Sequence, residues 1–489
     1  MRRRVRSVLA RVPRAAWLCA AVAFANALAW SLLVPPFQVP DENAHYAYVA
    51  QVAERGTVPH QVLPEITVPR AEEATLEEIG FYRMVGEPLN PAPLLQDQQR
   101  AIEAVARERL ATVGDGDALS ATNNPPLYYA LEAVPYKLAG GTVLDRLAAM
   151  RVLSALIGAL TVLLVYLFLA ELLPAQPWSW SAGALAAALQ PLFAFMSGGV
   201  NNDDLLYLMA TGFLWATARA FRRGLTPATG ALLGAFLGLG LVTKLTLLGF
   251  IPAAVLALAA LLRRGWRGER RVALRGGTFA VAFAAAPFAL YEALNRLVWH
   301  RVTVPASLGK VAGVSGHRFS LREEVSHVWQ LFLPRLWMHA QFPHFQLWKT
   351  WFTGLVGRFG WLDYGFPTWF YDLALTLAVI VVALALAELA RRRMALRRRL
   401  DELFVYAFVV LGLCAEIGVE SYHAFVASNE VFQQPRYLLP LLALYAGVLA
   451  LATRRGGRRW GPVLGVAVVM LALGHDLYAQ ALTVARYYA

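Results

Sequence analysis

Long apolar runs alternate with short polar segments along most of the chain. A helix needs roughly 20 mostly apolar residues to cross a bilayer. Eleven runs approach or reach this length, at residues 15–34, 147–173, 180–197, 205–221, 228–242, 245–262, 272–299, 369–390, 403–422, 437–453 and 461–482. They show no strand-like alternation of the kind that marks a membrane β-barrel. The pattern therefore predicts an all-α polytopic membrane protein with about 11 transmembrane helices, within a range of 10–13.

Two hydrophilic stretches interrupt the apolar runs, at residues 35–146 and 300–367. No internal repeat or flexible linker separates them from the spans, so residues 1–489 are interpreted as a single transmembrane domain with two elaborated loops. Both loops are expected to carry helices that lie on the membrane surface. The short apolar segment at 127–138 is one of these, because a full span there would invert every span that follows.

Composition and charge exclude a soluble globular protein. Hydrophobic residues make up 58% of the chain, charged residues only 16%, and the mean hydropathy is +0.48. The net charge of +13 comes mostly from arginine clusters between spans, at 2–14, 219–223, 263–275, 391–399 and 454–459. Such clusters mark cytoplasmic loops, so the N-terminus is expected in the cytoplasm and both long loops outside. Membrane lipids are the expected partner of this charge, and no nucleic acid is.

The candidate catalytic residues follow the first span directly. Asp41 and Glu42 lie in the segment 35–45, whose prolines disfavour helix and hold the carboxylates at the membrane surface. Adjacent carboxylates suit general-base chemistry. His45 shares a helical face with Asp41 if a helix has begun. The plainer alternatives are that Asp41 only caps a helix over 43–54 and that His45 is a surface residue.

Two cations lie on the expected external side, against the usual bias of positive charge. Arg436 begins the tenth span, and Lys244 lies between the fifth and sixth. A charge in this position calls for an anionic partner. That partner is either a lipid phosphate or one of the aspartates Asp203, Asp204 and Asp363.

Further polar and aromatic residues complete the expected binding site. Asn201, Asn202 and Asp203 form a turn between the third and fourth spans, where they either bind sugar hydroxyls or cap the fourth span. The histidines of the second loop lack the spacing of a zinc motif, so no metal site is assigned. A divalent cation, Mg²⁺ or Mn²⁺, at Glu42 stays open, and no other cofactor is indicated. The binding set is completed by three tyrosines, Tyr128, Tyr129 and Tyr437.

Five segments carry a family resemblance, at 35–45, 124–129, 201–203, 359–363 and 434–440. In this order they resemble the landmarks of a bacterial family of predicted membrane proteins that is similar to GT-C glycosyltransferases. The resemblance implies a GT-C-like fold in the bacterial cytoplasmic membrane and a polyprenyl-phosphate sugar donor. It also implies an external active site, with a glycan, lipid or protein of the cell envelope as acceptor, and Asp41 as the catalytic carboxylate. Pro435 departs from the glycine expected before the Arg-Tyr pair.

Sugar transfer from a lipid phosphate needs a base for the acceptor hydroxyl and positive charge for the departing phosphate. Asp41, helped by Glu42, and Arg436 match these two needs, which predicts an inverting membrane glycosyltransferase. Two alternatives stay open. A transporter of lipid-linked sugars or polysaccharides would need a polar path to both faces, whereas the polar residues gather on one. A non-catalytic envelope assembly protein would have the same fold and a dispensable Asp41.

Overall fold

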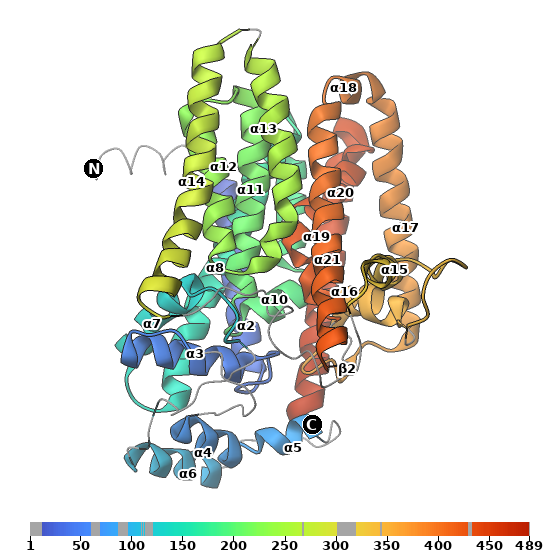
Figure 1. The fold of residues 1–489 in the computed structure, drawn as a ribbon. Helices are drawn as coiled ribbons and strands as arrows, with labels where there is room; N and C mark the ends of the chain where they lie inside the picture. Colours follow the sequence, from blue (N-terminus) through green and yellow to red (C-terminus); the bar gives the residue numbers. More distant parts are fainter. Residues whose placement is uncertain are drawn as a thin grey trace.

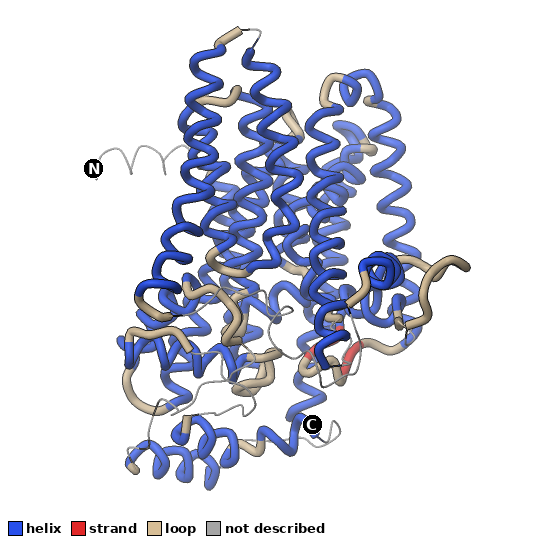
Figure 2. The backbone as a smooth tube through the Cα atoms, in the orientation of Figure 1, coloured by secondary structure: helices blue, strands red, loops and turns tan. Residues whose placement is uncertain are grey.

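The computed structural model describes residues 12–59, 69–86, 96–108, 110, 112, 121–266, 268–300, 319–342, 345–428 and 433–488. In this part of the chain, long helices run side by side as a bundle (Figure 1). Almost all of it is helical, apart from one small pair of strands (Figure 2).

The elements fall into a bundle set and a set of short elements. The bundle contains α2 (Arg14–Leu33), α8 (Val143–Leu172), α9 (Pro177–Ala188), α10 (Pro191–Ser197), α11 (Asp203–Arg223), α12 (Pro227–Leu241), the 3₁₀ turn η1 (Leu245–Phe250), α13 (Ile251–Trp266), α14 (Arg270–Leu297), α17 (Thr368–Arg391), α19 (Leu400–Ser428), the 3₁₀ turn η4 (Pro435–Leu441), α20 (Leu442–Arg454) and α21 (Gly457–Tyr488). The short elements are α3 (Glu42–Arg55), α4 (Arg70–Glu78), α5 (Phe81–Gly86), α6 (Gln96–Arg107), α7 (Leu127–Ala139), α15 (Leu321–Phe332), the π-helical turn η3 (Trp348–Thr353), α16 (Gly354–Gly357), β1 (Arg358–Phe359), β2 (Tyr364–Gly365) and α18 (Arg393–Arg397).

The predicted all-α polytopic architecture is confirmed, and each of the eleven expected spans coincides with one helix or two consecutive ones. Within the described residues, eight helices are long and apolar enough to cross a membrane. The pair α9 and α10, bent by 62°, gives a ninth candidate, and α12 is a shorter apolar helix. The count of spans is therefore approximate, and the bend lies in the third expected span. The hairpin of β1 and β2 is an addition that the pattern did not predict.

The two ends of the bundle differ in character. The α13–α14 loop and α18, which belong to arginine clusters, lie at one end, and α3, α4, α6 and α7 gather at the other (Figure 1). The segment expected to be interfacial, 127–138, forms α7 and packs on α3 and α8. Most of the first arginine cluster, at 2–14, lies outside the described residues.

Small residues allow α12 and α14 to pack at very close range. Gly230, Gly234 and Gly238 recur every four residues along α12 and lie against the backbone of α14. A Cβ added to Gly234 would come within 2.1 Å of the Ala280 carbonyl oxygen. Such spacing is typical of helices that associate inside a bilayer, where apolar burial alone drives no association.

A buried arginine on α8 fixes the path of the chain from α2 to α3. Arg151 donates from Nη1 to the carbonyl oxygens of Ser31 and Val34, both at 2.9 Å, and from Nη2 to that of Pro35 at 3.1 Å. These carbonyls lie at and just beyond the end of α2, where a helix leaves its last acceptors unpaired. Arg151 therefore satisfies the end of one helix from the side of another.

The same guanidinium holds Glu42, the first residue of α3. Nε donates to Oε1 at 2.8 Å and Nη2 to Oε2 at 2.6 Å, which makes the pair bidentate. Glu42 also accepts from the backbone N–H of Phe37 at 2.8 Å and of Val200 at 2.9 Å. Its side chain has 0% exposure. These four hydrogen bonds give Glu42 a structural part in the fold, and its expected catalytic or metal-binding role stays a prediction.

Replacing Glu42 by Gln should destabilise the protein strongly, because it leaves the Arg151 charge buried without its counter-ion. Breaking a buried pair in this way costs roughly 3–5 kcal/mol. The measurement is the unfolding midpoint of the purified protein in detergent.

Glu103→Gln provides the matched control. Glu103 pairs with Arg107 at 3.7 Å on the exposed surface of α6, and such pairs contribute only about 0–1 kcal/mol. Equal midpoints for the two variants would show that the Glu42–Arg151 pair does not hold the fold.

Candidate active site

Asp41 stands at the start of α3 in an unusual backbone conformation. Its φ of 62° and ψ of 9° are left-handed, a region that Asp and Asn tolerate better than other residues with a side chain. As the N-cap residue it makes no side-chain capping hydrogen bond. The alternative that Asp41 merely caps the helix is therefore not supported, and its carboxylate turns to another partner.

That partner is Arg436, at the start of η4. Nη2 of Arg436 donates to Asp41 Oδ2 at 2.5 Å, and Nη1 donates to the carbonyl oxygen of Pro40 at 3.2 Å. Its Nε lies 3.3 Å from Oδ2 of Asp203. One guanidinium thus connects three segments that are far apart in the sequence.

Asp203 continues the network to the second expected cation. Lys244 Nζ lies 2.5 Å from Asp203 Oδ1. The order of charges is Lys244, Asp203, Arg436 and Asp41, which alternates in sign and sums to zero. We call these four residues the charge tetrad. Of the three aspartates that the sequence left open as partners, Asp203 is the one that pairs with Lys244 in this structure.

Burial distinguishes the members of the charge tetrad. The side chains of Asp203 and Arg436 are 1% and 5% exposed, that of Lys244 is 17% exposed, and that of Asp41 is 31% exposed. Both cations also lie over the ring of Tyr437, at 5.3 Å and 5.5 Å from its centroid. Asp41 is therefore the member most open to a reaction partner.

Charge keeps Asp41 ionised. Burial alone would raise the pKa of its carboxyl, but the guanidinium of Arg436 outweighs burial and holds the pKa below its usual value of 3.8. At neutral pH the group is a carboxylate that can accept a proton.

The two asparagines support the backbone around the charge tetrad. Asn201 Nδ2 donates to the carbonyl oxygen of Pro40 at 3.0 Å, and its Oδ1 accepts from the N–H of Asp203 at 2.9 Å. Asn202 Nδ2 donates to the carbonyl oxygen of Thr243 at 3.3 Å. Both side chains are fully buried. They position the residues on either side of the tetrad, and their expected contact with sugar hydroxyls stays a prediction.

The expected aromatic and histidine contacts lie in the core beside α3. Tyr128 and Tyr129 have 0% exposure, so both rings are packed inside the protein, and their expected contact with a substrate stays a prediction. The Tyr129 hydroxyl lies 2.9 Å from His45 Nδ1, and the Tyr128 hydroxyl lies 2.9 Å from Ser154 Oγ. Burial lowers the pKa of His45 from 6.5 to about 3, against the opposing effect of Asp41. His45 is therefore neutral and packed inside the protein, which corrects its placement at the surface.

Asp363 belongs to a separate ion pair. It lies in the turn between β1 and β2, where Oδ1 accepts from the N–H of Trp361 at 3.0 Å. Its Oδ2 lies 3.1 Å from Nε of Arg486, near the end of α21. The hairpin is thereby attached to the last helix, and Asp363 does not join the charge tetrad.

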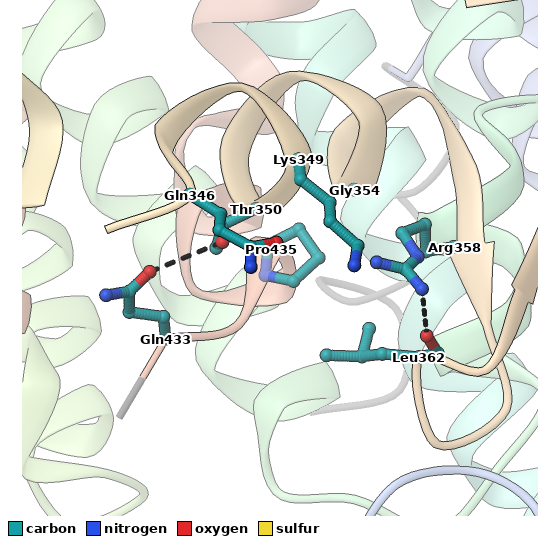
Figure 3. Close-up of a pocket in the computed structure, with 8 residues that line it drawn as sticks. All are labelled: Gln346, Lys349, Thr350, Gly354, Arg358, Leu362, Gln433 and Pro435. Carbon is teal, nitrogen blue, oxygen red and sulfur yellow. Dashed lines mark hydrogen bonds between the residues drawn. The ribbon is translucent and has the colours of Figure 1, made fainter. Parts of the chain in front are cut away.

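A cavity of about 310 Å³ lies beside the tetrad, on the other side of Pro435. Figure 3 shows its lining, in which the side chains of Gln346, Lys349 and Arg358 point toward a common space. Pro435 forms one wall and is followed directly by Arg436. As the first residue of η4, Pro435 suits its place, because a helix start needs no N–H there. This accounts for proline where the family resemblance leads us to expect glycine.

Sequence reasoning missed three charged residues. Arg151 lies inside the second expected span, where a charge among apolar residues is itself a signal. Lys349 and Arg358 lie in the second hydrophilic loop, on the same expected external side as Arg436. Positive charge on the expected external side singled out Arg436 and Lys244, and the same argument would have singled out Lys349 and Arg358.

Among the residues with described positions, no group of three or more His, Cys, Asp or Glu side chains is placed to hold a metal ion. The divalent cation left open by the sequence stays untested by this observation.

No curated protein matches the chain. Among solved structures, it is similar to the apo form of the Archaeoglobus fulgidus oligosaccharyltransferase, at 14% sequence identity and a TM-score of 0.43. That match covers 96% of this chain and 56% of the archaeal one, so the chain spans little more than half the length of that protein. The family described as "Predicted membrane protein (DUF2142)" matches residues 24–445. The match covers most of the sequence, and the chain therefore belongs to the DUF2142 family of predicted membrane proteins.

Proposed function

We propose that this protein is an integral membrane glycosyltransferase of the GT-C type, with Asp41 as its catalytic base. The observation that carries the proposal is the placement of Asp41. Its side chain is 31% exposed, although the other members of the charge tetrad are more deeply buried. It lies at the end of the helix bundle opposite the α13–α14 loop and α18. A network that serves only stability would have no need to leave one carboxylate open. The order of the motifs resembles that of a bacterial family of membrane proteins that is similar to GT-C enzymes, which supports the same reaction class.

The proposed reaction is one displacement at the anomeric carbon of a sugar joined to a polyprenyl phosphate. The acceptor hydroxyl oxygen forms a bond to that carbon, the bond from the carbon to the phosphate oxygen breaks, and the configuration inverts. Asp41 takes the hydroxyl proton, and the lipid phosphate leaves with the bonding electrons. The acceptor is a glycan, lipid or protein of the cell envelope.

Arg436 has a defined part in this proposal. It fixes the Asp41 carboxylate through Nη2 and anchors the preceding carbonyl of Pro40 through Nη1. A base must lie within hydrogen-bond reach of the proton it takes, and a carboxylate on a rigid support meets that need. The sequence-based expectation that Arg436 binds the donor phosphate stays a prediction, because its guanidinium is engaged with two carboxylates here.

The distribution of the arginine clusters supports an external active site in the bacterial cytoplasmic membrane. Such clusters are typical of cytoplasmic loops, so those at the α13–α14 loop and α18 support a cytoplasmic location for that end of the bundle. Asp41, near the opposite end, is then external, where the polyprenyl-linked donor and the envelope acceptor would meet it.

Asp41→Asn should abolish transfer while the fold persists. Asn tolerates the left-handed conformation of this residue as well as Asp does, but it cannot accept the proton. Loss of a general base lowers the rate by roughly 100-fold to 10,000-fold. The measurement is turnover of purified protein with donor and acceptor, beside its unfolding midpoint.

Asp145→Asn serves as the control, because Asp145 is an exposed aspartate that caps α8 through Thr142. It should leave turnover near that of the wild type. Near-normal turnover of Asp41→Asn would instead support the assembly-protein alternative.

The charge of Arg436 should also set the pH dependence of turnover. The pKa of Asp41 lies below 3.8 because Arg436 favours the carboxylate, so wild-type activity that depends on this base should fall only in strong acid. Arg436→Gln removes the charge, the pKa of Asp41 rises, and the acidic limb of the profile should move to higher pH. Arg436→Lys should shift it less. Superimposable profiles for folded variants would refute the assignment of Asp41 as the titrating base.

Cysteine labelling tests the orientation. In a background where Cys19 and Cys414 are replaced by alanine, a cysteine at Ala139, the last residue of α7, should react with an impermeant reagent in intact cells. A cysteine at Ala395 on α18 should react only after lysis. The reverse result would invert the topology and place Asp41 on the cytoplasmic side.

A further inference from the structure

The cavity beside Pro435 brings together two positive charges, and no carboxylate of the described residues pairs with them. Lys349 and Arg358 are the charged residues of its lining, and the others are Gln346, Thr350, Gly354, Leu362, Gln433 and Pro435. Within the described residues neither cation has a carboxylate oxygen within 4 Å, whereas Asp363, in the adjacent turn, pairs with Arg486. Two like charges that face a common space raise each other's energy unless an anion joins them.

The charge tetrad differs in this respect. Its two cations are matched by two aspartates: Arg436 donates hydrogen bonds to Asp41 and to the carbonyl oxygen of Pro40, and it forms an ion pair with Asp203. A phosphate that approached Arg436 would have to displace Asp41 or Asp203. In the cavity, a phosphate would displace no carboxylate of the residues that the structure describes.

The lining is preorganised for an oxygen-rich anion. Arg358 is held by a hydrogen bond from Nη2 to the carbonyl oxygen of Leu362 at 2.5 Å, and Thr350 Oγ1 donates to Gln433 Oε1 at 3.3 Å (Figure 3). The planar guanidinium has further N–H donors, and the lysine adds a mobile point charge. Side-chain amides from Gln346 and Gln433 add neutral donors. The volume of about 310 Å³ is at the lower end for small-molecule sites, which suits a phosphate and the first groups attached to it.

The position of the cavity connects it to both the lipid surface and Asp41. Trp348 precedes Lys349 on η3 and is exposed, and Trp337 and Trp369 are also exposed. Exposed tryptophans of a membrane protein prefer the headgroup level of the bilayer. At the wall of the cavity formed by Pro435, Gly354 approaches the proline so closely that a Cβ added to Gly354 would lie 2.7 Å from the proline ring. The cavity wall is therefore in direct contact with the turn that carries Arg436.

We propose that the Lys349–Arg358 cavity seats the phosphate of a prenyl-phosphate lipid. This inference rests on the proposed function and names the donor-phosphate site within it. The phosphate is held by Lys349 and Arg358, and the sugar extends past Pro435 toward Asp41. Arg436 then serves as the positioning residue for Asp41 instead of as the phosphate ligand.

Binding without turnover tests the proposal. The probe is a prenyl monophosphate that lacks a sugar, titrated against purified full-length protein, with the matching prenyl alcohol and inorganic phosphate as comparison ligands. Lys349→Ala and Arg358→Ala should each weaken prenyl-phosphate binding by roughly 10-fold to 100-fold, the usual effect of losing a charged hydrogen bond. Binding of the prenyl alcohol should stay unchanged.

Three further variants guard against loss of folding and non-specific charge effects. Gln346→Glu, at an exposed position of the lining, adds a carboxylate of nearly the same size and should weaken binding as well. Lys137→Ala on α7 and Arg322→Ala on α15 remove exposed cations outside the cavity and should leave binding unchanged.

Wild-type affinity in the double variant Lys349→Ala and Arg358→Ala would overturn the proposal. Equal affinity for inorganic phosphate and prenyl phosphate would overturn its lipid part. Asp41→Asn separates this inference from the proposed function: it should retain prenyl-phosphate binding whether or not Asp41 is the catalytic base. Normal transfer in Asp41→Asn would therefore refute the base and leave the phosphate site standing.

Discussion

All five N–H donors of the Arg151 guanidinium are used inside the protein, three on carbonyl oxygens at the end of α2 and two on Glu42. The position of the candidate site depends on this one residue. A helix that ends near the membrane surface leaves carbonyls to satisfy, and here the same cation satisfies them and fixes the first residue of α3. Asp41, which precedes Glu42, therefore has little freedom in where it can lie. Its left-handed backbone is held by neighbours on both sides.

Two clusters of charge lie next to each other at this end of the bundle, and they are balanced differently. The charge tetrad is complete within the protein: each cation has an aspartate, and little of it is exposed. The cavity at Lys349 and Arg358 has no such balance among the described residues. A neutral buried network gives rigidity, whereas an unbalanced cavity gives affinity for an anion. Pro435 lies between the cavity and Arg436. A single turn of backbone would therefore fix the position of a phosphate bound in the cavity relative to Asp41.

Hydropathy was sufficient to predict the helices, because a bilayer leaves helices as one of only two ways to satisfy the backbone. Asp41 was singled out by its acidic neighbour and the prolines that follow the first span, and by the family resemblance. These signals could not tell Asp41 from Glu42. Their different roles depend on Arg151, which lies 109 residues away from Glu42, and on Arg436, which lies 395 residues away from Asp41.

The aromatic residues show a second limit of sequence reasoning. Tyr128 was expected among the residues that bind substrate, and its ring packs in the core, where its hydroxyl lies 2.9 Å from Ser154 Oγ. Whether an amphipathic ring faces a cavity or a neighbouring helix depends on how α3, α7 and α8 pack. Local pattern does not contain that information. Charge bias could have singled out Lys349 and Arg358 one by one, but it could not have paired them, since η3 and the β1–β2 hairpin bring them together only in the folded chain.

The charge tetrad also has a consequence for the order in which the protein is made. Asp41, Asp203 and Lys244 leave the ribosome long before Arg436. Until η4 is in place, two aspartates face a single lysine, and one negative charge is unmatched in surroundings that solvate it poorly. The nascent protein thus keeps a destabilised centre until η4 has been inserted. A chain in which η4 is inserted wrongly keeps this carboxylate without its cationic partner.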